Sequence, residues 1–326
     1  MSQITLIEAV TKALAYELAN DDSVVVLGED VGVNGGVFRA TDGLQKRFGK
    51  SRVLDTPLAE SMIAGVAIGM ATQGLKPVAE FQFSGFIYSA FDQIISHAAR
   101  MRNRTRGRLT CPLVFRAPYG GGIHAPEHHS ESTEALFAHI PGLRVVIPST
   151  PARAYGLLLA AIRDPDPVIF FEPNRIYRWG KQDVPDNGEA LPLDRCFILR
   201  EGTDVTLVSW GASIRETLEA AHALEQQGIS AEVIDVATVK PLDINTILES
   251  ISKTGRCVII HEAAKTCGIG AEISAELAEK GLMYLHAPIQ RVTGYDVTMP
   301  YYKLEKLYIP SENRIVKAVH KTLEFS

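Results

Sequence analysis

Cysteine is scarce in this sequence, and long apolar runs are missing from it. The four cysteines in 326 residues are Cys111, Cys196, Cys257 and Cys267, and no two of them form a C-x-x-C pair. This spacing indicates neither a zinc site nor a disulfide framework. No stretch reaches about 18 consecutive apolar residues, the length that a membrane-spanning helix needs, so no membrane segment is expected.

Positive charge is also in short supply, since 33 Lys and Arg face 38 Asp and Glu for a net charge of -5. A protein that binds the phosphate backbone of a nucleic acid needs a surface stripe of Lys and Arg, so nucleic acid is not an expected partner. The first twenty residues contain acids and an amphipathic helical pattern rather than a basic start and an apolar core. No signal peptide is therefore expected, and the cytosol (a cytoplasmic location) fits best.

Short apolar runs alternate with segments of helical period, a pattern typical of parallel sheets covered by helices. The predicted fold class is α/β, with two domains that each hold a mostly parallel sheet flanked by helices. Thr150 and Pro151 form a helix-start signal. In the first half the pattern predicts strands at 23–28, 77–83, 113–117, 144–148 and 168–172 and helices at 5–20, 58–73, 87–103 and 151–163.

The segment 180–200 breaks this alternation with Pro, Gly, Asp and Asn, which are typical linker residues. We place the domains at residues 1–188 and 189–326. The second domain repeats the alternation, with strands predicted at 204–210, 230–236 and 256–261 and helices at 215–227 and 244–253.

The predicted helix that begins at Glu60 is apolar or small around its whole circumference. A helix without a polar face is buried on all sides. Gly65 and Gly69 stand four residues apart and would let another backbone approach closely. From the pattern alone, a subunit interface and a central core helix are equally good interpretations.

Three groups of residues are candidates for chemistry. Glu60 has an ordinary explanation, because carboxylates favour the first turn of a helix, and a functional one, because a carboxyl group in apolar surroundings has a raised pKa. Phe86 follows a parallel strand, where it is either a core residue or a ligand platform. The long segment 117–142 carries His124, His128, His129 and Ser130, which are either surface residues or acid–base groups.

Several familiar motifs are incomplete or absent. Gly268 and Gly270 lack the third glycine of a dinucleotide fingerprint, and no G-x-x-x-x-G-K-[ST] phosphate loop occurs. Ser130 does not lie in a G-x-S-x-G elbow. Nicotinamide binding and serine hydrolase chemistry are therefore poorly supported.

Taken together and in this order, the segments resemble the beta subunits of thiamine-diphosphate-dependent 2-oxo acid dehydrogenases, over essentially the whole chain. The segments that carry the resemblance are VVLGEDVGVNGGVFRAT, DTPLAESMIAGVAIGMA, AEFQFSGFIYSAFDQI, HHSESTEALFAHIPGLRVVIPSTP, DPDPVIFFEP, VIDVATVKPLD and RVTGYDVTMP. The resemblance implies a transketolase-like pyrimidine-binding domain followed by a transketolase C-terminal-like domain.

By position, the resemblance implies that Glu60 bonds to the N1′ nitrogen of the aminopyrimidine and that Phe86 stacks on that ring. Glu29, Leu58 and Gln82 would line the same pocket. His129 would serve the acid–base and acyl-transfer steps. A potassium ion held by some members would lie, by position, at Leu113, Ala161, Ile162, Asp164 and Asp166, although relatives often have Asn in place of Asp166.

The family's G-D-G segment for binding the diphosphate through magnesium does not occur here. The resemblance therefore implies that a partner alpha subunit holds the magnesium, in a heterotetramer with two copies of each chain. A lipoyl acyltransferase component would receive the acyl group from the 2-oxo acid. We favour pyruvate as that substrate. A branched-chain 2-oxo acid and a non-catalytic assembly subunit stay open as alternatives, whereas a single-chain transketolase-like enzyme would need the missing motif.

Overall fold

The computed structural model describes residues 2–325. Two compact units make up the chain. Unit 1 comprises the described residues up to Tyr119 together with Leu136–Leu193, and unit 2 comprises Gly120–Ala135 together with the described residues from Asp194 onward. The domain boundary expected between residues 188 and 189 stays a prediction.

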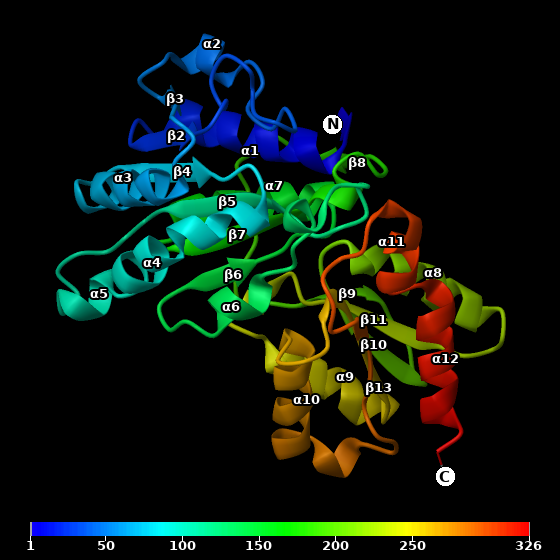
Figure 1. The fold of residues 1–326 in the computed structure, drawn as a ribbon. Coiled ribbons are helices and arrows are strands. Elements are labelled where there is room, and N and C mark those ends of the chain that lie inside the picture. The colour runs from blue at the N-terminus through cyan, green and yellow to red at the C-terminus, as the bar shows by residue number, and fades with distance from the viewer. Residues whose placement is uncertain (1, 326) are drawn as a thin grey trace. The chain divides into compact units, whose positions relative to one another are not determined.

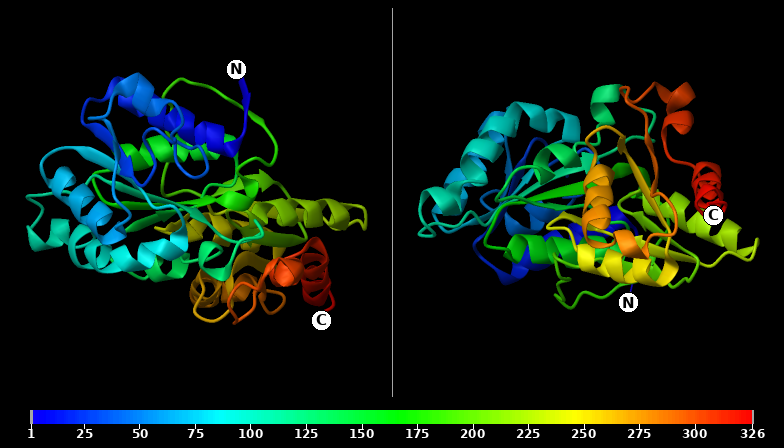
Figure 2. Two further views of the ribbon diagram at one scale, coloured as in Figure 1. Left: turned by 45° about the horizontal axis from the view of Figure 1, so that its top comes forward. Right: turned by 90° about the horizontal axis from the view of Figure 1, so that it is seen from below.

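Unit 1 is built on a parallel sheet whose strands run in the order β6-β7-β5-β4-β2-β3. Helices cover both faces of this sheet, with α1 and α7 on one face and α3 to α5 on the other (Figure 1, and Figure 2, right). Its elements are β1 (Ser2–Ile4), α1 (Leu6–Asn20), β2 (Val24–Gly28), α2 (Leu44–Phe48), β3 (Val53–Asp55), α3 (Glu60–Thr72), β4 (Lys76–Glu80), η1 (Ser84–Ala90), α4 (Phe91–Gln93), η2 (Ile94–Ala98), α5 (Met101–Arg104), β5 (Val114–Tyr119), β6 (Arg144–Val146), α7 (Pro151–Arg163), β7 (Val168–Pro173), η4 (Asn174–Ile176) and β8 (Gln182–Val184).

The local sequence explains these elements. Every residue of β2, β5 and β7 is buried, as expected of parallel strands covered on both faces. The hydroxyl of Thr150 accepts a hydrogen bond from the Arg153 amide and Pro151 occupies the first turn, so the predicted start of α7 is confirmed. The helix predicted at 87–103 is wrong as a single regular helix. Its chain passes through a 3₁₀ segment, a short α-helix and a π turn, in which the Ala99 amide bonds to the Ile94 carbonyl five residues back.

A buried ion cluster ties three strands of unit 1 together. Arg116 on β5 donates to both carboxylate oxygens of Glu172 on β7, at 2.6 and 2.8 Å, and to Glu80 on β4. The Tyr177 hydroxyl donates to Glu172 at 2.6 Å. Burial raises the pKa of Glu80, and the negative charge of Glu172 adds to that shift while Arg116 opposes it. Three buried charges are therefore mutually satisfied rather than orphaned.

Unit 2 holds a five-stranded sheet in the order β14-β13-β10-β11-β9, parallel except for β9, which pairs antiparallel with β11. Helices α8 and α12 cover one face and α9 and α10 the other (Figure 1). Its elements are η3 (Glu127–His129), β9 (Phe197–Arg200), β10 (Val205–Ser209), α8 (Ser213–Glu225), β11 (Ala231–Asp235), β12 (Thr238–Lys240), α9 (Ile244–Thr254), β13 (Cys257–Ala264), α10 (Ile269–Lys280), η5 (Leu282–Tyr284), β14 (Gln290–Gly294), α11 (Tyr302–Tyr308) and α12 (Glu312–Leu323). The short helix α6 (Glu134–Ala138) begins in unit 2 and ends in unit 1. The expected fold class is confirmed.

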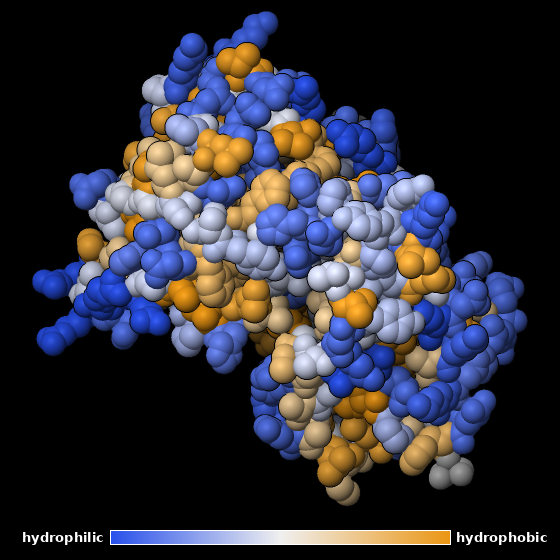
Figure 3. Space-filling model, in the orientation of Figure 1, coloured by the Kyte–Doolittle hydropathy of each residue, from blue (hydrophilic) through white to orange (hydrophobic). Residues whose placement is uncertain are grey.

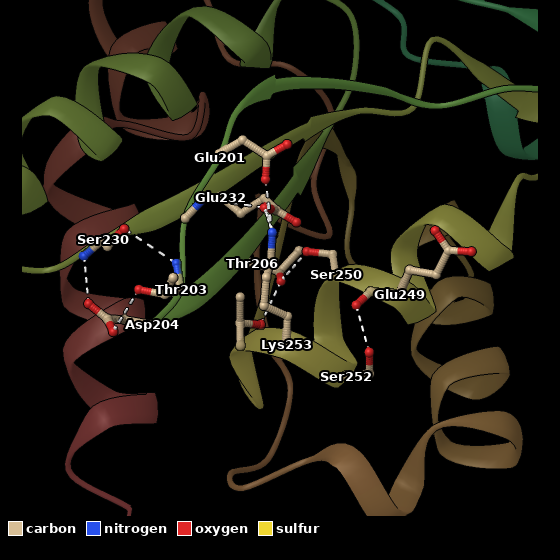
Figure 4. Close-up of polar contacts among 12 residues, drawn as sticks. Glu201, Thr203, Asp204, Thr206, Ser230, Glu232, Glu249, Ser250, Ser252 and Lys253 are labelled. Atoms are coloured by element: carbon tan, nitrogen blue, oxygen red, sulfur yellow. Dashed lines mark hydrogen bonds and ion pairs between the residues drawn. The ribbon is translucent and has the colours of Figure 1, made fainter.

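A polar network lies near the amino ends of β10 and β11 in unit 2 (Figure 4). The buried hydroxyl of Thr206 lies 2.6 Å from that of Ser250 and 2.7 Å from that of Thr254, both on α9. Beside it, Lys253 donates to Glu232, which is buried, and to Glu201, which is exposed. These contacts join α9 to two neighbouring strands.

We expect Thr206→Val to lower the free energy of unfolding by about 1–3 kcal/mol, because two buried hydroxyls lose their shared partner without a change in volume. Urea denaturation followed by circular dichroism measures this change. Thr203→Val is the matched control, since Thr203 is exposed and its hydroxyl makes only a 3.4 Å bond to Asp204. Equal effects from both variants would contradict the expectation.

Candidate functional site

The candidate residues of unit 1 lie where parallel strands end. Glu29 directly follows β2, and Gln82 follows β4 by two residues. Glu60 is the first residue of α3, and Phe86 lies in η1. Ligands of open α/β sheets bind at the carboxyl edge of the strands, so these four residues come from the segments that a ligand would contact.

One hydroxyl group links two of these residues. The Oγ of Ser89 donates to Glu60 Oε2 at 3.1 Å and lies 3.2 Å from the carbonyl oxygen of Phe86. The Ser61 hydroxyl in turn donates to the carbonyl of Ser89, which joins the first turn of α3 to η1. The structure therefore links the Glu60 carboxylate to the 3₁₀ segment that carries Phe86. Ser89 itself was not predicted, because a serine in this segment carries no sequence signal of its own.

The carboxyl group of Glu29 lies within electrostatic reach of Glu60. Its pKa is raised, first by burial and then by the negative charges of Asp30 and Glu60. Two carboxyl groups that repel each other in a partly buried place are stabilised by a shared proton or by a hydrogen-bonding ligand. Glu29 and Glu60 are thus the two acids with which the unit 1 site could hydrogen-bond a ligand.

The other three candidate residues of unit 1 are Phe86, Leu58 and Gln82. Phe86 is half-buried, and its ring packs edge-on against Phe83 at 5.4 Å, which in turn contacts Phe38 at 5.5 Å. Leu58 is 69 % exposed, and Gln82 is half-buried. Phe86 thus has a supported ring with part of its surface uncovered, as a stacking platform requires.

Helix α3 has two different faces. Ile63, Ala64, Ala67, Ile68 and Ala71 are buried in unit 1. Met62 and Val66 on the other side are 38 % and 41 % exposed. Apolar surface also covers the part of unit 1 that carries α3 and α4 in the space-filling view (Figure 3). The interpretation as a central core helix is therefore wrong, because part of its apolar surface meets solvent in this chain.

The histidine segment belongs to unit 2. His129 ends the 3₁₀ turn η3 and is half-buried; its amide donates to the Pro126 carbonyl at 2.9 Å. Ser130, the next residue, is buried. His124 and His128 are exposed. A cavity of about 370 Å³ lies next to this segment, lined by Ser130, Glu131, Ser132, Ala263, Ala264, Asp296, Val297, Thr298, Met299 and Tyr308.

The residues expected at a potassium site are close in the fold. The Leu113 carbonyl accepts from the Val168 amide at 3.0 Å, and the Ala161 carbonyl accepts from the Asp164 amide at 3.4 Å. The Asp164 carboxylate also bonds the Asp166 amide at 2.8 Å. These bonds place Ala161, Asp164 and Asp166 around the end of α7, and the potassium site stays a prediction. Both acids are paired with arginines, Asp164 with Arg144 at 2.9 Å and Asp166 with Arg102 at 2.7 Å, and such pairing fits a cation ligand poorly.

Within residues 2–325 no group of three or more His, Cys, Asp and Glu side chains is arranged to hold a metal ion. No helix in that range has both the length and the apolar character needed to cross a bilayer.

Comparison with known proteins identifies the family. Residues 2–180 match the family model described as the transketolase pyrimidine-binding domain, and residues 194–315 match the transketolase C-terminal domain. The beta subunit of the pyruvate dehydrogenase E1 component from Bacillus subtilis (strain 168) is 50% identical over 325 residues, 100% of each chain. The same subunit from Acholeplasma laidlawii is 50% identical over 321 residues, 98% of each chain. The chain belongs to the family of pyruvate dehydrogenase E1 component beta subunits.

A solved structure named "Split gene transketolase, inactive beta4 tetramer" matches this family member with a TM-score of 0.82 and 27% identity, and the match covers 99% of both chains. The resemblance drawn from the sequence segments is confirmed, and so is the fold that it implied. The roles of the individual site residues stay predictions.

A buried histidine in unit 2 of this E1 beta chain makes stability depend on pH. His261 stacks on Trp210 at 5.1 Å, and the indole N–H of Trp210 donates to Glu134 at 3.4 Å. Burial lowers the pKa of His261 to about 4, with Arg291 adding to the shift and a backbone bond to Ala263 opposing it. The folded state therefore holds this ring in its neutral form.

The pKa of His261 is lower in the folded protein than the unfolded value of 6.5. The unfolded chain therefore binds a proton more readily, and the free energy of unfolding decreases by up to about 3 kcal/mol as pH falls from 6.5 towards 4. We expect His261→Phe, which keeps a stacked ring without a titrating group, to flatten this part of the stability–pH curve. Urea midpoints of both proteins at several pH values measure the difference. Identical slopes for the two proteins would contradict it.

Proposed function

We propose that this chain is the beta subunit of a pyruvate dehydrogenase E1 component and supplies the pyrimidine half of a thiamine diphosphate site. The family membership supports the cofactor and the reaction class. The observation that carries the residue assignment is the Ser89 hydroxyl, which bonds Glu60 and also lies within hydrogen-bond distance of the backbone of Phe86. An acid linked to a segment that carries an aromatic ring suits an aminopyrimidine, which needs a hydrogen-bond partner in its plane and a surface against its face.

In this proposal Glu60 bonds the N1′ nitrogen of the pyrimidine and shares a proton with it. Glu29 lies within electrostatic reach of Glu60, because the charge of Glu60 contributes to the raised pKa of Glu29 after burial and Asp30. Phe86 stacks on the face of the aminopyrimidine ring, while Leu58 and Gln82 line the rest of the pocket. When bound, thiamine diphosphate supplies a thiazolium that accepts the electron pair released in decarboxylation of the 2-oxo acid. The protein groups orient the ring and control its protons.

An alpha subunit is the proposed partner, with magnesium and the diphosphate on its side, and the assembly is a heterotetramer. The exposed apolar residues Leu58, Met62 and Val66 at α3 give this chain a surface that suits a subunit contact. The related split-gene transketolase is named as a tetramer of four beta chains that is inactive. A site that needs both kinds of chain agrees with that name.

His129 is the proposed acid–base group at the substrate, and a lipoyl group of an acyltransferase component is the proposed acceptor of the acyl group. The proposed potassium site comprises Leu113, Ala161, Ile162, Asp164 and Asp166. The ion would order the loop that joins α7 to β7. Pyruvate is the proposed substrate, because the relatives with 46–50% identity are named pyruvate dehydrogenase subunits.

We expect Glu60→Gln to slow decarboxylation of the bound 2-oxo acid by at least about 100-fold, because an amide cannot exchange the proton that a carboxyl group exchanges. Thiamine diphosphate should still bind within roughly tenfold of the normal affinity. Both quantities are measured on the variant assembled with its alpha chain and magnesium, by steady-state kinetics and by titration calorimetry.

Asp22→Asn is the matched control for that experiment. Asp22 is an exposed acid of unit 1 just before β2, at the opposite strand end from Glu29, and it pairs only with Arg52 at 3.4 Å. Its activity should be unchanged. A Glu60→Gln enzyme that decarboxylates at the normal rate would refute the assignment of Glu60.

The reconstituted enzyme also discriminates between the alternative functions. We expect kcat/KM for pyruvate to exceed that for 3-methyl-2-oxobutanoate, and the beta chain alone to be inactive, because the diphosphate would lack its binding groups. The reverse preference would indicate a branched-chain enzyme. Full activity of the alpha chain without this chain would indicate a non-catalytic assembly subunit.

A further inference from the structure

The segment that carries His129 is held by two buried carboxylates from distant parts of the sequence. Glu262 on β13 and Glu305 on α11 are 5% and 2% exposed. Glu262 Oε1 accepts from the Gly121 amide at 2.5 Å and from the Ser132 hydroxyl at 3.3 Å. One carboxylate oxygen therefore joins residues on either side of η3, the turn that His129 ends.

Glu305 holds the next part of the same segment. Its Oε1 accepts from the Gly122 amide at 2.7 Å and from the His124 amide at 3.4 Å, and its Oε2 lies 3.6 Å from the His124 ring. Amide bonds to a carboxylate are stronger than those between neutral groups, and they are stronger still where water is excluded. Two successive glycine amides are thus fixed by two different acids.

The glycines are required by this arrangement. Gly120 has a φ of +82°, and a Cβ there would lie 2.8 Å from Glu262 Oε1. A Cβ on Gly121 would collide with the methyl group of Met299. Gly120 therefore leaves room for the Glu262 carboxylate, and Gly121 leaves room for the Met299 side chain. At the base of the loop, the Gly120 amide donates to the Glu131 carbonyl at 3.0 Å, which closes the segment between Gly120 and Glu131.

We propose that Glu262 and Glu305 are positioning residues: they fix the backbone of Gly121, Gly122 and His124 so that His129 is presented in one orientation. This inference rests on the proposed role of His129. Neither acid has to touch the substrate to act in this way. A displacement of about 1 Å at an acid–base group can cost about 100-fold in rate, so loosening the loop should affect turnover more than substrate binding.

The first measurement does not depend on activity. Hydrogen exchange of the beta chain, read by mass spectrometry on peptides that cover residues 117–132, should show at least tenfold faster exchange at Gly121 in Glu262→Ala and at Gly122 in Glu305→Ala. Glu262→Gln keeps a carbonyl acceptor of the same size and should restore most of the protection. Unchanged exchange in both alanine variants would overturn the inference.

The matched control is Glu232→Ala. Glu232 is also a buried acid of unit 2, and it accepts from the Gly202 amide and from Lys253 in the network of Figure 4. That network lies near the amino ends of β10 and β11, where it joins these strands to α9. Glu232→Ala should lower stability while leaving both the exchange of Gly121 and the kcat of the folded enzyme unchanged.

The second measurement separates positioning from a merely structural role. In the enzyme reconstituted with its alpha chain, Glu262→Ala should lower kcat about 10- to 100-fold with less than about a threefold change in the KM for pyruvate. If Glu262 acts through His129, then Glu262→Ala combined with His129→Ala should be no slower than His129→Ala alone. Additive losses in the double variant would overturn the positioning role.

The single variants keep the two proposals apart. A slow His129→Ala enzyme together with a Glu262→Ala enzyme of normal kcat would overturn this inference and leave the proposed function intact. A His129→Ala enzyme of full activity would remove the proposed role of His129, and the positioning role would fall with it.

Discussion

The guanidinium of Arg116, buried between the carboxylates of Glu80 and Glu172, is the interaction on which unit 1 depends. It links β4, β5 and β7 near the carboxyl ends of the strands, where Gln82 and η1 begin. Desolvation alone would lower the pKa of Arg116, but the two carboxylates outweigh it and keep the guanidinium charged. Removal of Arg116 would leave two buried carboxylates facing each other, so this edge of the sheet holds its shape only with the whole cluster present.

Much of the fold could be predicted because its signals are local. Apolar runs marked β2, β5 and β7, although Arg116 interrupts the second and Glu172 the third, and the pair Thr150 and Pro151 fixed the start of α7. The segment after Gln82 was harder, because aromatic and small residues there satisfy α, 3₁₀ and π geometry about equally, and tertiary packing selects among them. The apolar circumference of α3 had two interpretations, and the exposure of Met62 and Val66 argues against the central core helix, while the subunit interface stays a prediction.

The sequence also contains a signal for buried charge that hydrophobic periodicity does not capture. Arg116 and Glu172 each lie as the single charge within an otherwise apolar strand. Glu80 ends β4, which begins with Lys76, and His261 with Glu262 lies within the apolar strand β13. An ionisable residue in such a run indicates one of two things. Either the strand has been predicted in the wrong register, or the buried residue is paired with another polar group. Pairing itself could not be predicted, because Glu262 and Glu305 meet the glycines of residues 120–122 across about 140 and 180 residues of chain.

The membership of residues 120–135 in unit 2 limits how this protein can be recombined. A hybrid of two related beta chains that exchanged parents only near residue 190 would separate the glycine segment from its own Glu262, Met299 and Glu305. Its new neighbours would have to offer the same acceptor oxygens and the same gap for two glycines. A functional chimera therefore needs residues 120–135 from the parent that supplies the carboxyl-terminal unit, which means three crossover points instead of one.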